Sequence, residues 1–110
     1  APAVLRDAAR VSRGGGTLVI AVPHPVENVV SSEAPYHFEH AYWSRQVDFD
    51  WRFEDGTEAR FRDFPRTVAE WFTLVTDAGY TVERMLEPEG RDDERRSIVP
   101  YVLIIKARKR

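Results

Sequence analysis

The hydrophobic and polar positions divide the chain into a short series of elements, and the most telling is the nearly unbroken apolar run of residues 17–22. Because polar and apolar side chains do not alternate there, the run predicts a strand covered on both faces, as in the parallel sheet of a doubly wound α/β protein. Before it, residues 2–11 have helical spacing, and the glycine triplet at 14–16 can end a helix. Too few residues precede the run to hold a parallel neighbour, so we expect the back half of something larger.

Residues 46–64 alternate aromatic with charged side chains, which predicts a β-hairpin. A two-residue loop would set Phe49 and Trp51 opposite arginines, whereas a three-residue loop pairs Phe49 with Phe61 and Trp51 with Ala59 and keeps one face apolar. We therefore predict a type I turn followed by Gly56 in the left-handed conformation, forming a bulge.

The remaining pattern completes a single domain over residues 1–110. Thr67 and Glu70 have the spacing of a capping box at the start of an amphipathic helix. Two further strands are expected over residues 80–86 and 98–107. Between them we expect a solvated charged loop at 87–96, and after them a frayed basic tail at 106–110.

Composition narrows the class of protein. Sixteen basic against 18 acidic residues leave a formal charge of -2, which argues against nucleic acid as a partner. The sequence has no cysteine, so a thiolate metal site and catalytic cysteine chemistry are excluded. Apolar runs are too short to cross a bilayer and the first residues do not have the shape of a signal peptide, so we expect no membrane partner and a soluble, cytoplasmic protein.

The order of these elements resembles the C-terminal half of a class I S-adenosylmethionine-dependent methyltransferase, a Rossmann-like fold. That family commonly has an Arg-Val-Leu-Lys/Arg-Pro-Gly-Gly turn before its fifth strand, and here the turn runs Arg10-Val11-Ser12-Arg13-Gly14-Gly15-Gly16. Ser12 and Gly14 depart from the family's leucine and proline. The family's helix and turn before the sixth strand resemble residues 64–72 and 74–80, and its sixth and seventh strands resemble residues 83–88 and 100–109.

The resemblance implies a small mixed sheet in the order five, seven, six, with a flanking helix pair and an added hairpin. It implies a substrate-side insert over residues 26–64 and a function as the substrate-side region of a methyltransferase acting on a small molecule. In the family, S-adenosylmethionine is held mainly by residues after the first, second and fourth strands. None of these lies in the sequence, so we expect no cofactor-binding residues here, weak binding of the cofactor and an inactive isolated chain.

The candidate site residues follow from this placement. His24 comes at the end of the first strand, where a neutral imidazole could take a proton from the methyl acceptor, or could simply pack between two prolines. Tyr36, His37, His40 and Trp43 could line a small-molecule pocket or cover the hairpin. Arg66 could reach a substrate carboxylate or be solvated. The spacing of His37 and His40 does not favour a metal site.

Two other hypotheses remain open. The chain could be a non-enzymatic α+β module that binds a ligand or partner through its aromatic hairpin and insert. Its first strand, without a neighbour on one side, is an exposed edge that could pair with a second copy. We therefore expect a homo-oligomer or a swapped dimer.

Overall fold

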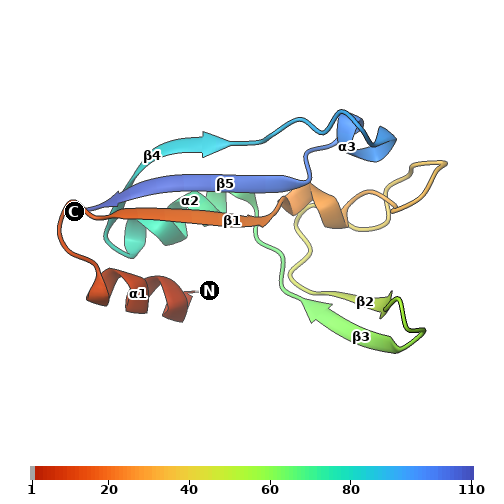
Figure 1. Ribbon diagram of the computed structural model, residues 1–110, viewed down its shortest axis with the longest axis horizontal. Coiled ribbons are helices and arrows are strands. Elements are labelled where there is room, and N and C mark those ends of the chain that lie inside the picture. Colours follow the sequence, from red (N-terminus) through yellow and green to blue (C-terminus); the bar gives the residue numbers. More distant parts are fainter. Residues whose placement is uncertain (1) are drawn as a thin grey trace.

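The computed structural model describes residues 2–110, which form a body of about 47 × 29 × 28 Å (Figure 1). The elements follow the predicted sequence of helix, strand, hairpin, helix and two strands. In chain order they are α1 (Pro2–Val11), β1 (Thr17–Pro23), the 3-10 helix η1 (Pro25–Asn28), β2 (Val47–Arg52), β3 (Glu58–Asp63), α2 (Val68–Asp77), β4 (Tyr80–Leu86), α3 (Glu94–Ile98) and β5 (Val102–Lys109). No helix among these residues is long and apolar enough to cross a membrane.

The main sheet has the strand order β1-β5-β4, so the last strand lies between the other two, as the resemblance implied. Ile105 of β5 is opposed by Ile20 of β1 on one side and by Met85 of β4 on the other. Both pairings are antiparallel. The two outer strands, β1 and β4, therefore run in the same direction on either side of β5. The apolar run of β1 is therefore not part of a parallel pair within residues 2–110.

The core lies on one face of this sheet, where α1 and α2 pack against β5 and the start of β4. Its fully or nearly fully buried members are Leu5, Ala9, Val75, Tyr80, Leu103, Ile105 and Ala107. Burying a side chain as large as that of Ile105 contributes about 1.5–3 kcal/mol to the stability of the fold.

The other face of the sheet is open, and here the expectation of a β1 covered on both faces was wrong. Exposure alternates along β1, and Val19 is 62% exposed. Both long helices contribute to the same core cluster, so no described element covers the face that carries Val19.

The hairpin of β2 and β3 has the predicted register, with Phe49 opposite Phe61 and Trp51 opposite Ala59. Gly56 has φ +88° and its N–H donates to the carbonyl of Phe53 at 3.0 Å, which closes the three-residue turn. The prediction of a left-handed Gly56 is confirmed. Figure 1 shows this two-stranded unit projecting away from the main sheet.

The 87–96 run is mostly exposed, as expected of a solvated segment, but this run and the basic tail both contain regular elements. The 87–96 run contains the start of α3, whose N-cap is Asp93. The basic tail continues β5 to Lys109, whose Nζ donates to the carbonyl of Ala9 at 2.6 Å at the end of α1. Arg110 donates to the carbonyls of Tyr80 and Thr76, so both cations satisfy carbonyls near helix ends.

Candidate functional site

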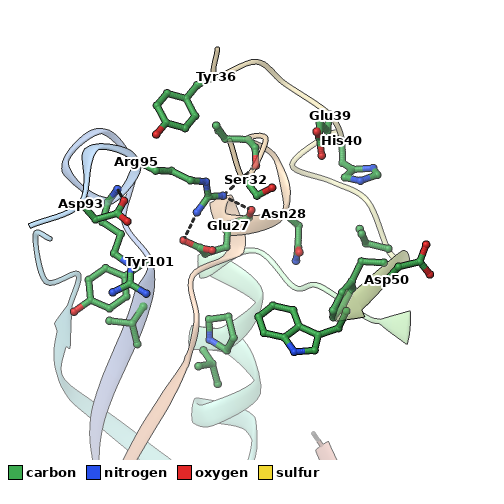
Figure 2. Close-up of a pocket in the computed structure, with 18 of the residues that line it drawn as sticks. Glu27, Asn28, Ser32, Tyr36, Glu39, His40, Asp50, Asp93, Arg95 and Tyr101 are labelled. Carbon is green, nitrogen blue, oxygen red and sulfur yellow. Dashed lines mark hydrogen bonds and ion pairs between the residues drawn. The ribbon is translucent and has the colours of Figure 1, made fainter. Parts of the chain in front are cut away.

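A cavity of about 850 Å³ lies at the end of the sheet where β1 finishes (Figure 2). Residues Ala21 to Pro23 of β1 and Val102, the first residue of β5, form its floor. In open α/β sheets, ligands bind outside the carboxyl ends of the strands, and this cavity has that position. Its size is in the range of small-molecule sites.

One wall is the turn that follows β1, and it is held by Arg95. The guanidinium of Arg95 donates through Nη1 to Oε1 of Glu27 at 2.8 Å and through Nη2 to the Glu27 carbonyl at 2.7 Å. It also donates to the carbonyls of Val30 at 3.0 Å and Ser31 at 2.8 Å. Figure 2 shows Arg95 extending to Glu27 from the side of the cavity that carries Asp93 and Tyr101.

The hairpin supplies a second, aromatic wall. Phe49 and Trp51 line the cavity beside Asp50, and the ring of Phe49 stacks on that of Phe61 with 5.6 Å between centroids. Phe49 is 40% exposed and Trp51 is 54% exposed, so both rings keep apolar surface that a ligand could cover.

Two tyrosines border the remaining side. Loss of solvent around the Tyr36 hydroxyl raises its pKa above the ordinary 10.0, and the carboxylates of Glu94 and Asp93 raise it further against the opposing charge of Arg95. The hydroxyl therefore stays protonated and can donate a hydrogen bond to a ligand. The guanidinium of Arg96 lies over the ring of Tyr101, with its Cζ atom 4.6 Å from the ring centroid.

His24 follows Pro23, which lines the cavity, but is not itself among the lining residues; it is almost fully buried, with 5% of its surface exposed. Its Nδ1 accepts the N–H of Val26 at 3.1 Å as the N-cap of η1, and its Nε2 contacts Oε2 of Glu87 at 2.5 Å. Because Nδ1 is an acceptor, the ring proton is on Nε2 and points at Glu87. Both nitrogens are engaged, so a general-base role requires Nδ1 to release Val26; that role stays a prediction.

Of the other predicted site residues, four lie in the insert and Arg66 lies just before α2. Tyr36 and His40 line the cavity, whereas His37 and Trp43 are not among its lining residues. His37 is exposed beside the carbonyl of Pro35, and Trp43 is 68% exposed and packs edge-on against Tyr42.

Arg66 lies apart from this cavity. It borders a shallow depression on α2 with Ala69, Glu70, Thr73 and Leu74. A contact between Arg66 and a ligand in the main cavity stays a prediction.

The insert is fastened to the start of α2 by two polar contacts. The Tyr42 hydroxyl accepts the N–H of Val68 at 3.1 Å, and Arg45 forms an ion pair with Glu70, the capping-box residue of α2. These contacts place the segment between η1 and the hairpin on a rigid element. A cavity wall built from a long insert can hold its shape through such attachments.

The glycine turn of residues 14–16 does not have the placement of a phosphate-binding loop. The glycine turn lies between α1 and β1, not between a strand and a following helix, and Gly15 donates to the carbonyl of Lys109 at 2.8 Å, at the far end of the sheet from the cavity. Within residues 2–110, no group of three or more His, Asp or Glu side chains is placed to hold a metal ion.

Several cavity residues lay outside the sequence-based prediction, above all Arg95, Arg96, Tyr101 and Glu27. Their signal is weak because Arg95 lies in a mixed-charge run that is typical of a solvated loop. Asp93, as a helix-capping residue type before a short polar run, was the one local sign of structure there.

The fold matches that of solved S-adenosylmethionine-dependent methyltransferases. A protein assigned to this class from Listeria monocytogenes superposes with a TM-score of 0.73 at 17% identity, over 99% of this chain and 54% of that one. A methyltransferase of the class from Mesorhizobium loti gives 0.68 at 16% identity, over 98% and 54%. No family model and no curated protein sequence matches the chain.

These likenesses confirm the predicted resemblance at the level of fold. The chain spans about half the length of each of these two proteins.

Proposed function

We propose that this chain is the substrate-side part of an S-adenosylmethionine-dependent methyltransferase, and that its cavity binds a small-molecule methyl acceptor. The observation that carries the proposal is the placement of the cavity at the carboxyl end of β1 in a chain whose fold follows methyltransferases along 99% of its length. The apolar floor and aromatic wall suit an acceptor with an apolar body.

The cofactor belongs to the rest of the fold in this proposal. S-adenosylmethionine supplies the methyl group when bound, and the residues described here contribute acceptor binding and orientation. Transfer requires the nucleophile to be aligned with the methyl group, which depends on how rigidly the acceptor is held. We expect the isolated chain to bind the cofactor weakly and to be inactive. A cytoplasmic location also stays a prediction, supported by the cysteine-free composition.

The test uses the full-length gene product, with S-adenosylmethionine labelled in its methyl group and a panel of small-molecule acceptors. Phe49→Ala removes an aromatic side chain from the cavity wall, and we expect it to raise KM for the acceptor about tenfold while KM for the cofactor changes little. Phe53→Ala is the matched control, because Phe53 is 43% exposed, lies near the same Phe61 and is not among the lining residues.

Two outcomes would count against the proposal. The first is an equal effect of the two variants on acceptor KM. The second is the absence of methyl transfer by the full-length product together with tight calorimetric binding of a small ligand by the 110-residue chain alone. That second result would favour the non-enzymatic binding module.

A further inference from the structure

Arg95, in the first turn of α3, makes an unusual set of contacts for an arginine in a mixed-charge run. Its side chain is only 13% exposed, and all four of its hydrogen bonds go to one short stretch, residues 27–31, more than 60 positions away along the chain. A planar guanidinium can satisfy several acceptors at fixed angles, which a lysine ammonium cannot reproduce. The contact set is therefore specific to arginine.

The carbonyls that accept from Arg95 lie at the end of η1 and just after it. η1 ends at Asn28, and carbonyls at the end of a short helix have no further helical partners. Arg95 takes up the carbonyls of Glu27, Val30 and Ser31 and neutralises the half-buried Glu27 carboxylate. The turn after β1 is therefore stabilised by the side chain of Arg95, which belongs to α3.

This turn also holds the hairpin. Asn28, between the residues that Arg95 binds, donates from Nδ2 to Oδ2 of Asp63 at 3.1 Å. Asp63 ends β3 and is paired in register with Val47 at the start of β2. A continuous series of contacts therefore runs from Arg95 through the turn to the base of the hairpin that carries Phe49 and Trp51.

We propose that Arg95 is a positioning residue for ligand binding, which fixes the turn at residues 27–31 and, through Asn28 and Asp63, sets the hairpin against the cavity. Four of the five guanidinium N–H groups donate within the protein, so the role assigned to Arg95 is to hold the cavity wall in place. The role in ligand binding rests on the proposed function, whereas the positioning itself does not.

The three tryptophans of the chain allow a direct test with 5-fluorotryptophan and ¹⁹F NMR on the full chain. Trp51 lines the cavity, and Trp71 packs against the core and reports on the overall fold. We expect Arg95→Ala to shift or broaden the Trp51 signal and to leave Trp71 unchanged. Asn28→Ala should move the same signal. Arg91→Ala, in the same mixed-charge run but with an 85% exposed side chain, should move neither signal.

Chemical rescue separates the guanidinium fork from simple charge. Ethylguanidinium at millimolar concentration should restore the Trp51 signal of Arg95→Ala, and ethylammonium should not. An unchanged Trp51 in Arg95→Ala, or equal rescue by both cations, would overturn the proposal. If Arg95→Ala loses the Trp71 signal as well, Arg95→Lys provides the second variant, and an unshifted Trp51 there overturns the proposal too.

Full-length enzyme then tests the link to binding. Arg95→Lys should raise KM for the acceptor with a smaller change in kcat, since the residue shapes the wall and does not contact the reacting atoms. An Arg95→Lys enzyme with unchanged acceptor KM but a shifted Trp51 would overturn the role in ligand binding. Absence of methyl transfer by the unmodified protein would instead remove the proposed function and leave the ¹⁹F result standing.

Discussion

Nε2 of His24 lies 2.5 Å from Oε2 of Glu87, and this contact joins the residue that follows β1 to the residue that follows β4. The two strands are not neighbours, because β5 lies between them. The same imidazole caps η1 through Nδ1. His24 therefore secures the point at which the chain leaves the sheet, next to Pro23 in the cavity lining.

Two substitutions separate the two contacts of His24. His24→Asn keeps a side chain that can cap η1 and loses the contact with Glu87, whereas His24→Ala loses both. We expect losses in the free energy of unfolding of about 1 kcal/mol for Asn and about 2 kcal/mol for Ala, measured by urea denaturation. Equal losses in the two variants would show that the cap contributes nothing.

Gly56 provides a test of the hairpin turn. Its φ of +88° is strained for any other residue, and an added Cβ would meet no atom within 4 Å, so the effect of Gly56→Ala is confined to the backbone. We expect a loss of about 1–2 kcal/mol in hairpin stability, followed by the Trp51 ¹⁹F signal during urea titration. Gly14→Ala is the control, because its site is equally open and its φ is not in the left-handed region. Similar losses for both would contradict the left-handed turn.

The hairpin and the capping box were predictable because their signals are local. The register follows from keeping Phe49, Trp51 and Phe61 on one face, and the pairing of Thr67 with Glu70 spans three residues. The strand order could not be obtained from periodicity and came from the resemblance alone.

The contacts of Arg95 and Lys109 could not be predicted for the opposite reason. Their partners, in residues 27–31 and in α1, lie 64 to 100 positions away in the sequence. A long cationic side chain next to acidic residues is usually solvated, and composition cannot tell when a fold brings carbonyls within its reach. The side of the cavity formed by Arg95 was therefore not predicted. Tyr36 and His40, which also line the cavity, were predicted from their aromatic and polar character.

The ion pair between Arg45 and Glu70 leads us to expect that stability depends on pH. The hydrogen bond from Arg45 holds the pKa of Glu70 below its ordinary value of 4.5, and Glu70 raises the pKa of Arg45 in turn. A carboxyl group whose pKa is lowered in the folded state makes its full contribution to stability at any pH above the pKa of the unfolded state. As pH falls from about 4.5 through the lower pKa of the folded state, this contribution is lost.

Glu70→Gln should therefore flatten the fall in stability below pH 4.5, since glutamine can still serve in the capping box but does not titrate. Arg45→Met should have a similar effect, and Glu54→Gln, at an exposed turn position with no ion pair among the described residues, should leave the profile unchanged. Thermal unfolding between pH 3 and 7 measures the three profiles; identical curves for wild type and Glu70→Gln would exclude this pair as a source of acid sensitivity.

Lys109 tests whether the basic tail is structural. Its ammonium donates to the carbonyl of Ala9 near the end of α1 and lies 5.9 Å from the ring centroid of Tyr80. We expect Lys109→Met to lower the free energy of unfolding by about 1 kcal/mol, because a helix carbonyl loses its charged donor. Lys106→Met, at an exposed position of the same strand, should change it by less than about 0.5 kcal/mol. A frayed tail would give the same small change at both positions.

The free edge of β1 leads to the last prediction. Among residues 2–110, β1 pairs only with β5, and its exposed face carries Val19. An apolar strand with one unpaired edge is a template for a second copy, so we expect the 110-residue chain to form a dimer or swapped assembly in multi-angle light scattering. Val19→Lys places a charge next to that edge and should shift the mass to that of a monomer, whereas Val4→Lys, 70% exposed on α1, should not. A monomeric wild type at high concentration would show that the edge is protected without a partner.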